Sequence, residues 1–482
     1  MKVKTVGWMA ALGMVLSSVS VWSLTKPKGP GLTTTADSAL TAPIASPTDV
    51  QSQFQIDGPL QLSGRLGHGT LLVGKQAQSY LLTTVVAKAG LASRQPLNLA
   101  VVLDRSGSMK GRRMDNALAS ARDMIRRLSD GDVLTIIAYD TTTDQLLPPT
   151  RIDGSSRERA LSALANVQAK GDTCISCGID AGMAALRQNS GMVDRILLLS
   201  DGEPTSGIKD LAGFRTLAAS ARAMGCAVSS VGVDVEYNER VLSALALESN
   251  GTHYFAETPT DVANAFDKEL ATLSKTTAKD VEVRIRLQEG VQLDQVVDRA
   301  FRREGNEVVV PLGSFSESEE KTVLLRIAHR PEGGVRMPIA KVELSYDGPR
   351  GTRERASGQL EADLTTDPNL VAPLDGVVEA RLTRTESADA LLDANRAIAT
   401  GDLRGAEEKL QRALQGVRSK RKSLAARSPV ATKSRVDQDL ANQEGALDKA
   451  ARELGNAPAG DSERTNKVQQ KKNVEASNPF RL

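Results

Sequence analysis

The sequence has few aromatic residues, few cysteines and no marked excess of charge, and each shortage excludes a class of function. Aromatic residues make up 3% of the 482 residues, which argues against base-stacking platforms and sugar-binding aromatic walls. Three cysteines are too few for a disulfide scaffold. A formal net charge of +2 argues against a nucleic-acid binder. The chain also lacks the glycine-rich loops of nucleotide sites and the serine elbow of hydrolases.

Long apolar runs are also missing, except at the N-terminus. Lys2 and Lys4 precede an apolar run over residues 6–24, and two further lysines follow it. This pattern is typical of an export signal, and the run is nearly long enough to span a bilayer. We therefore expect residues 1–25 to be a signal peptide or an N-terminal membrane anchor. The rest of the chain is then exported, to the periplasm, the cell surface or the medium.

The pattern of apolar residues changes several times along the chain, which predicts several domains. From Asn98, wholly apolar strands alternate with amphipathic helices, as in a mostly parallel sheet covered on both faces. After Lys279 apolar and polar residues alternate, which predicts an antiparallel sandwich. We expect a linker over 26–57, β-strands over 58–93, an α/β domain over 97–275, a β-sandwich over 279–365, a helical region over 367–454 and a disordered tail over 455–482.

The strands expected over 58–93 have no partner of their own before the α/β domain begins. We expect them to complete the later sandwich, so that the α/β domain is inserted in it or flanked by it. The predicted fold class is therefore α/β, with an antiparallel β-sandwich and a C-terminal helical region.

Polar side chains follow three predicted strands at the points where those strands end. The apolar run LNLAVVLD ends on Asp104, and Ser106 and Ser108 follow at alternate positions. Thr173 stands just before a predicted helix, and Asp201 follows the apolar strand RILLLS. In an open parallel sheet, ligands bind at the carboxyl ends of the strands. Carboxylate and hydroxyl oxygens suit a hard cation, so these residues predict a site for Mg²⁺, or for Mn²⁺ or Ca²⁺.

Residues 97 to about 275 resemble a von Willebrand factor type A (VWA) domain. Asp104, Ser106 and Ser108 match the D-x-S-x-S motif of that family in the form DRSGSM, and Thr173 and Asp201 match its second and third metal-site loops. The resemblance implies a Rossmann-like fold and a metal-ion-dependent adhesion site, at which an acidic residue of a protein partner completes the coordination of Mg²⁺.

Two cysteines follow the threonine of the second loop directly. Cys174 and Cys177 have the C-x-x-C spacing, which allows a disulfide, and they stand at the start of a predicted helix. A stabilising disulfide in an oxidising compartment, a redox lock on the metal loop and two buried thiols all remain open.

These observations predict an exported, non-enzymatic protein that binds a protein partner through a divalent cation, without nucleic acid and with membrane attachment through the N-terminus as an option. Two alternatives remain: a metal-dependent hydrolase on a Rossmann-like fold, and a membrane-associated scaffold or chaperone subunit.

Overall fold

A computed structural model describes residues 52–90, 95–348, 351–455 and 462–481. The predicted signal peptide or anchor, and most of the predicted linker, lie outside these described residues. None of the helices within them is long and apolar enough to cross a membrane.

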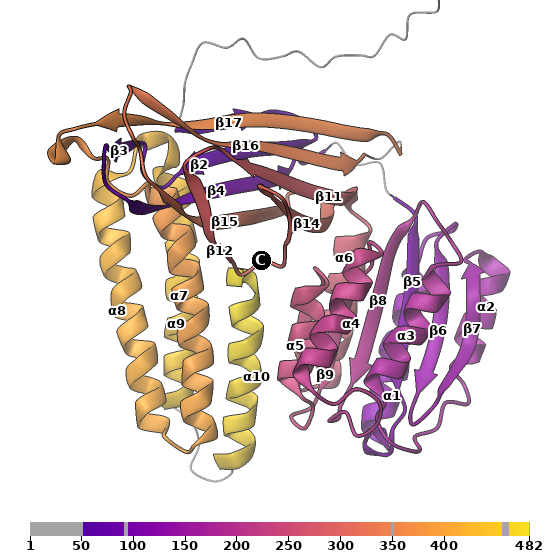
Figure 1. The fold of residues 1–482 in the computed structure, drawn as a ribbon. Coiled ribbons are helices and arrows are strands. Elements are labelled where there is room, and N and C mark those ends of the chain that lie inside the picture. Colours follow the sequence, from indigo (N-terminus) through magenta and orange to yellow (C-terminus); the bar gives the residue numbers. More distant parts are fainter. Residues whose placement is uncertain (1–51, 91–94, 349–350, 456–461, 482) are drawn as a thin grey trace, which may run out of the picture. The chain divides into compact units, whose positions relative to one another are not determined.

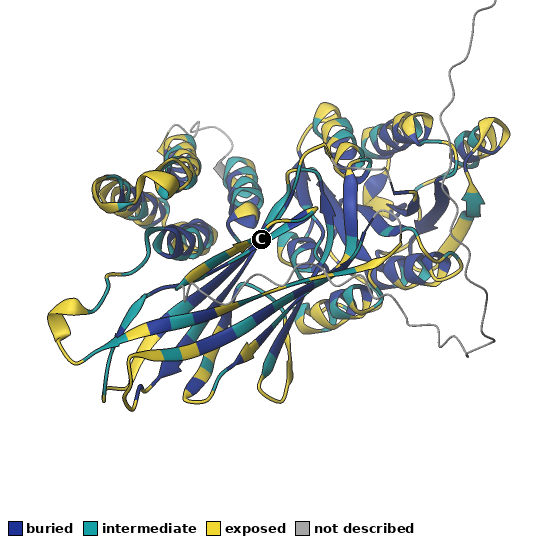
Figure 2. Cartoon of the chain, turned by 90° about the horizontal axis from the view of Figure 1, so that it is seen from above, coloured by how far each residue is buried: buried dark blue, intermediate teal, exposed yellow. Residues whose placement is uncertain are grey.

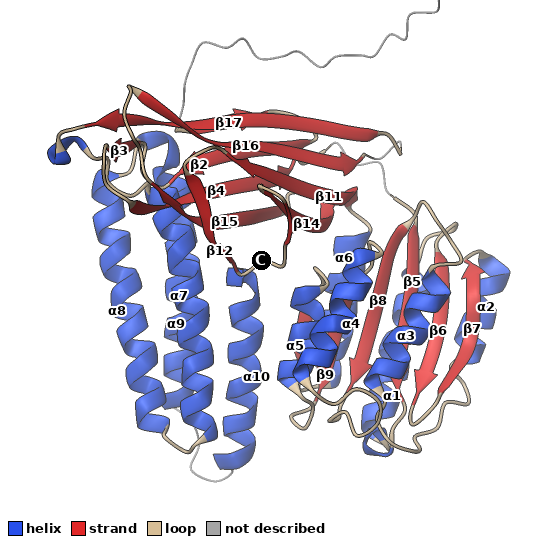
Figure 3. Ribbon diagram, viewed as in Figure 1, coloured by secondary structure: helices blue, strands red, loops and turns tan. Residues whose placement is uncertain are grey.

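The α/β part is a six-stranded sheet with helices on both faces (Figures 1 and 3). The strand order is β10-β9-β8-β5-β6-β7; β7 is an antiparallel edge strand and the other pairings are parallel. The strands are β5 Leu97–Asp104, β6 Val133–Tyr139, β7 Thr143–Arg151, β8 Val193–Ser200, β9 Ala227–Val233 and β10 His253–Ala256. The helices are η1 Gly107–Met109, α1 Arg112–Arg127, α2 Gly154–Ala163, α3 Ile175–Leu186, α4 Leu211–Ala223, α5 Glu239–Glu248 and α6 Pro259–Leu273.

The central strands of this sheet are buried along their whole length, which explains their continuous apolar sequences. Every residue of β5, β6 and β9 is buried (Figure 2). One apolar cluster joins the sheet to α1, α2 and α6, and a second joins the opposite face to α3, α4 and α5. A parallel strand covered on both faces cannot alternate between apolar and polar residues. The predicted α/β fold is confirmed.

Segments before and after this domain in the sequence together form a β-sandwich. Its two sheets have the orders β1-β2-β4-β15-β12 and β13-β14-β11-β16-β17-β3. Strand β4, which precedes the α/β domain, pairs antiparallel with β15, which follows it. The strands are β1 Gln53–Ile56, β2 Leu60–Leu66, β3 Thr70–Leu72, β4 Ala77–Ala87, β11 Thr276–Leu287, β12 Val291–Val297, β13 Arg302–Glu304, β14 Glu307–Ser316, β15 Glu320–His329, β16 Arg336–Asp347 and β17 Arg353–Thr365.

Residues of the sandwich strands alternate between buried and partly exposed positions, as the sequence pattern predicts. Buried residues alternate with partly exposed ones along β2, and the buried side chains of both sheets form one apolar core. Strand β1 lies inside the segment that was expected to be a linker. Its four residues carry too short an alternation to stand out in the sequence, and they form a strand because β2 supplies the backbone partners.

In the described part of the C-terminal region, the chain forms four long helices and a short one. They are η2 Pro368–Leu370, α7 Gly376–Ala399, α8 Leu403–Arg427, α9 Val430–Gly455 and α10 Ser462–Arg481. Helix α10 contradicts the disordered tail that the composition predicted.

Helix α10 combines a few apolar contacts, through Val468 and Phe480, with many polar ones, which is why its composition reads as disordered. Its contacts with α7 centre on Asn395, whose side chain donates to the Gln470 carbonyl at 2.8 Å and accepts from Asn473 at 2.8 Å. Against the α/β domain, the buried Lys471 Nζ donates to the Tyr237 carbonyl at 2.6 Å, lies 4.3 Å from the centre of the Tyr237 ring and pairs with Glu239. A buried ammonium group is tolerated because it is paired and hydrogen-bonded.

Candidate metal centre

The carboxylate of Asp104 is a buried charged group at the carboxyl edge of the sheet. Asp104 ends β5 and has no exposed surface. Its Oδ2 accepts hydrogen bonds from Ser200 Oγ at 2.6 Å and from Tyr139 Oη at 3.1 Å, while its Oδ1 accepts from the backbone N–H of Ser106 at 2.8 Å. These bonds fix the orientation of the carboxylate before any ligand arrives.

The charge of Asp104 is poorly compensated. Burial raises the pKa of Asp104 to about 6, although hydrogen bonds from Ser106 and Ser200 oppose that shift. The main influences on this pKa include a second carboxylate, Asp201, and no positive charge. A buried carboxylate without a cation is costly, because the low-dielectric interior disfavours its charged form.

A chain of hydroxyl groups joins the first loop to the third. Ser106 Oγ lies 3.0 Å from Ser108 Oγ, and Ser108 Oγ donates to Asp201 Oδ1 at 2.7 Å. Asp201 directly follows β8 and is buried. Burial raises the pKa of Asp201, against hydrogen bonds from Ser108 and from Arg113.

Thr173 brings the second loop to the same place. A Cβ atom added at Gly202 would lie 3.3 Å from Thr173 Oγ1 and 3.4 Å from Ser108 Oγ, so these two hydroxyls flank one point beside Asp201. The backbone N–H of Thr173 donates to Thr205 Oγ1 at 2.9 Å, which ties the second loop to the third. The structure therefore brings together all five residues that the sequence singled out as metal ligands.

Close packing of α3 against the sheet sets the position of the second loop. A Cβ atom added at Gly178 would come within 2.8 Å of side-chain atoms of Tyr139 and Val102, so only glycine allows α3 to lie this close. The start of α3, and Thr173 before it, are thereby held beside the end of β5.

Two residues that no sequence pattern singled out, Arg113 and Asp234, also lie at this site. Arg113 extends from α1, and its Nη1 lies 2.9 Å from Asp201 Oδ2 while its Nη2 lies 2.6 Å from Asp234 Oδ2. Asp234 directly follows β9, so the strand-end rule that selected Asp104 and Asp201 could have selected it too. Arg464 of α10 pairs with the other oxygen of Asp234 at 2.9 Å.

The donor set consists of two carboxylates and three hydroxyls. Within the described ranges, no three His, Cys, Asp or Glu side chains form a cluster that could hold a metal ion. A cation at the candidate site would therefore rely on hydroxyl oxygens and on water in addition to Asp104 and Asp201. Hard cations such as Mg²⁺ keep several waters and accept this kind of mixed oxygen shell.

A disulfide stands next to the second loop. The Sγ atoms of Cys174 and Cys177 are bonded, with their Cα atoms 5.3 Å apart. The backbone of Gly207, in the third loop, packs so closely here that an added Cβ atom would lie 2.5 Å from Cys174 Sγ. The disulfide therefore supports both loops. The third cysteine, Cys226, is buried, and burial raises the pKa of its thiol to about 12.

The cysteine pairing predicts a specific labelling pattern. When protein from its native compartment is unfolded and alkylated without a reductant, mass spectrometry should find Cys226 modified and Cys174 and Cys177 unmodified. Addition of a reductant before alkylation should label all three residues. Labelling of all three without a reductant would contradict the disulfide in the native protein.

The α/β domain matches a known protein family. Residues 98–268 match the family model of the von Willebrand factor type A domain. The chain is 27% identical over 305 residues to an uncharacterized protein of Synechocystis, sll0103, and the match covers 61% of this chain and 70% of that protein. It is 26% identical over 215 residues to the uncharacterized Escherichia coli protein YfbK, covering 44% of this chain and 37% of that one.

Two solved structures resemble the chain over most of its length. One is a von Willebrand factor type A protein from Catenulispora acidiphila, with a TM-score of 0.66 and 19% identity over 83% of this chain and 91% of that one. The other is the ArnB paralog VWA2 from Sulfolobus acidocaldarius, with a TM-score of 0.59 and 16% identity over 88% of this chain and 100% of that one. At these identities the likeness establishes the fold. The inserted α/β domain of this chain is a von Willebrand factor type A domain.

Proposed function

We propose that this chain is an exported protein that binds a protein partner through a divalent cation, Mg²⁺ in the first place, at the carboxyl edge of its VWA sheet. VWA domains are typically non-enzymatic modules that mediate protein interactions. The proposal is that this one works through an intact metal-ion-dependent adhesion site.

The uncompensated charge of Asp104 is the observation that carries the proposal. Its carboxylate is wholly buried, is fixed by three hydrogen bonds and lies beside Ser106, whose hydroxyl group lies 3.0 Å from that of Ser108. An oxygen-lined position next to a buried, unneutralised carboxylate favours a hard cation. When bound, the cation supplies a positive centre that an acidic side chain of a partner can approach.

The residues of the chain have distinct roles in this account. Asp104 and Asp201 supply negative charge, and Ser106, Ser108 and Thr173 supply neutral oxygens. Arg113 pairs with Asp201 and so holds this carboxylate in place in the absence of a cation.

Export is the second element of the proposal. The disulfide between Cys174 and Cys177 supports it, because disulfides persist in oxidising compartments. The N-terminal segment that would direct export lies outside the described residues.

Replacement of Asp104 by asparagine should separate metal binding from folding. Asn keeps the size of the side chain and removes a buried charge, so Asp104→Asn should fold with an unchanged or higher melting temperature in Mg²⁺-free buffer at pH 8. Its Mg²⁺ affinity, measured by calorimetry, should fall by about thirtyfold or more, since loss of one partner of a buried charge pair costs at least about 2 kcal/mol.

Asp172→Asn is the matched control, because Asp172 adjoins Thr173 but is exposed. Wild type and this control should both gain stability from Mg²⁺, by about 2.7 kcal/mol at one hundred times the dissociation constant. Equal Mg²⁺ affinity in Asp104→Asn and Asp172→Asn would refute the site.

Replacement of Arg113 should raise the Mg²⁺ affinity, whereas replacement of Asp104 should lower it. Its guanidinium group occupies Asp201 Oδ2, so a cation must compete with it for this carboxylate. Arg113→Met should therefore bind Mg²⁺ more tightly, by about fivefold, which corresponds to about 1 kcal/mol for a partly exposed ion pair. Arg112→Met, the exposed neighbour on the same helix, should match wild type. Weaker binding by Arg113→Met would show that Arg113 supports the site instead.

Capture of a partner tests the function itself. Immobilised full chain should retain one or more proteins from the extracellular or periplasmic fraction in Mg²⁺, and should release them in a chelator. Asp172→Asn should retain the same proteins, and Asp201→Asn should retain none of them. Retention that is indifferent to both the chelator and Asp201→Asn would favour a metal-independent scaffold. Turnover of a phosphate ester that is lost in Asp201→Asn would favour the hydrolase.

A further inference from the structure

One face of helix α10 carries three basic side chains that contact the loop between β9 and α5. Arg464, Lys467 and Lys471 are spaced three and four residues apart, which brings them to the same face of a helix. Arg464 Nη1 lies 2.9 Å from Asp234 Oδ1, and Lys467 Nζ lies 3.3 Å from Glu236 Oε2. Lys471 is buried against the end of the same loop. Because this loop follows β9 at the carboxyl edge of the sheet, α10 contacts the edge that holds the candidate metal centre.

Asp234 of this loop is shared between α10 and the candidate metal centre. Its Oδ1 pairs with Arg464, while its Oδ2 accepts from Arg113 Nε at 3.1 Å and from Arg113 Nη2 at 2.6 Å. Burial raises the pKa of Asp234, but hydrogen bonds from Arg113 and Arg464 outweigh burial and hold that pKa below its ordinary value. The remaining nitrogen of Arg113, Nη1, lies 2.9 Å from Asp201 Oδ2. Each arginine thus takes one oxygen of Asp234, and Arg113 also binds Asp201.

Arg464 blocks the strongest pairing that Arg113 and Asp234 can form. An arginine binds a carboxylate most strongly when two of its N–H groups meet the two oxygens side by side. Arg464 occupies Oδ1 of Asp234, so two N–H groups of Arg113 converge on Oδ2 instead. Without Arg464, both oxygens of Asp234 become accessible to Arg113, and the guanidinium group can turn away from Asp201.

We propose that Arg464 is a positioning residue for the metal centre: it occupies Oδ1 of Asp234, keeps Arg113 on Asp201 and thereby lowers the affinity of the centre for a divalent cation. This inference rests on the proposed function, because the cation is the one proposed there. Movement of α10 away from the loop between β9 and α5 then raises the cation affinity, and a bound cation weakens the contact of α10 with this loop by the same factor.

Replacement of Arg464 by methionine tests the proposal. In calorimetry, Arg464→Met should bind Mg²⁺ about threefold more tightly than wild type, as expected for the loss of one partly exposed ion pair. In the Arg113→Met background the same replacement should have no further effect, because Arg464 acts through Arg113. A crystal structure of metal-free Arg464→Met should show Arg113 bound to both oxygens of Asp234 and no longer in contact with Asp201.

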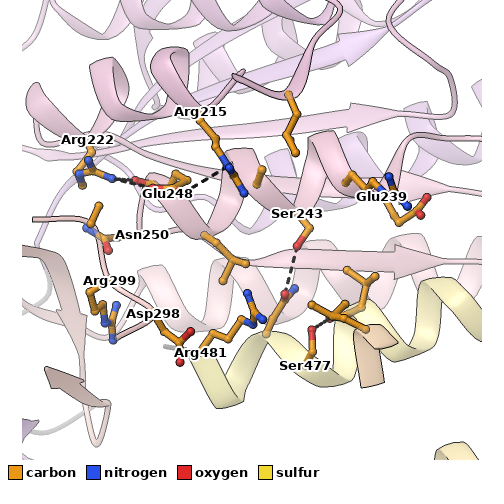
Figure 4. A pocket seen from close by; sticks show the side chains of 18 of the residues that line it. Arg215, Arg222, Glu239, Ser243, Glu248, Asn250, Asp298, Arg299, Ser477 and Arg481 are labelled. Carbon is orange, nitrogen blue, oxygen red and sulfur yellow. Dashed lines mark hydrogen bonds and ion pairs between the residues drawn. The ribbon is translucent and has the colours of Figure 1, made fainter. Parts of the chain in front are cut away.

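Two variants control for charge and for the docking of α10. Lys467→Met removes the same charge from the same face of α10, but Lys467 pairs with Glu236 rather than with Asp234. At the other end of α10, Ser243 Oγ of α5 donates to Asn478 Oδ1 at 3.3 Å beside a cavity of about 410 Å³ (Figure 4), and none of the arginines and aspartates that link α10 to the metal centre lines this cavity. Ser243→Ala therefore loosens α10 without touching Asp234. Both control variants should bind Mg²⁺ as wild type does, and the melting temperature of every variant shows whether it folds.

The proposal is overturned if folded Arg464→Met binds Mg²⁺ no more tightly than wild type, if Lys467→Met raises the affinity equally, or if Arg113 still contacts Asp201 in metal-free Arg464→Met. A threefold effect that persists in the Arg113→Met background also overturns it, because Arg464 then acts through its charge alone. If wild type binds no Mg²⁺ at all, the proposed function fails and this inference fails with it. In a wild type that binds Mg²⁺, the other outcomes overturn the role of Arg464 and leave the metal centre in place.

Discussion

The burial of one carboxylate, Asp104, at the carboxyl edge of a parallel sheet is the constraint on which the rest of the site depends. Parallel pairing of β5 with β8 and β6 sends the ends of all three strands to one edge. Tyr139 and Ser200, which end the two neighbouring strands, therefore donate to Asp104 directly. The sheet thus orients the negative charge of Asp104, and the side chains of the sheet do not neutralise it.

Other parts of the chain contact this edge through charged groups. A chain of ion pairs links α10 to the candidate metal centre. Arg113 pairs with both Asp201 and Asp234, and Arg464 of α10 pairs with Asp234. At the opposite end of the domain, α6 ends at Leu273 and β11 begins at Thr276. Ser316 Oγ, at the end of β14, donates to the Thr272 carbonyl at 2.8 Å. Any movement of α6 would thus act on the sandwich directly.

Sequence patterns predicted the parts of this molecule that depend on local periodicity. Continuous apolar runs such as LNLAVVLD identified the buried strands, and the polar residues at their ends identified Asp104, Ser106, Ser108, Thr173 and Asp201, which the structure brings together. The prediction of the buried strands succeeded because burial on both faces leaves a local mark in the sequence. That the five polar residues bind a metal stays a prediction.

Contacts between distant segments leave no such mark. Arg464 reaches Asp234 across more than two hundred residues, and its own surroundings are polar, so the composition pointed to disorder. In the sequence, Lys471 is indistinguishable from a surface lysine. In the fold, it contacts the Tyr237 ring and pairs with Glu239. The short strand β1 depends in the same way on its partner β2. Tertiary pairing decides the structure of such segments, because their own sequences bury too little apolar surface.

We propose that a divalent cation is surrounded by Asp104, Ser106, Ser108, Thr173 and Asp201. The most direct test is anomalous diffraction from crystals of the full chain grown with Mn²⁺, which replaces Mg²⁺ in oxygen sites and scatters anomalously. One strong peak is expected at the carboxyl end of β5, between the oxygens of these side chains, and no peak there in crystals of Asp104→Asn. A peak elsewhere only, or none at saturating Mn²⁺ with Arg113 still paired with Asp201, would contradict it.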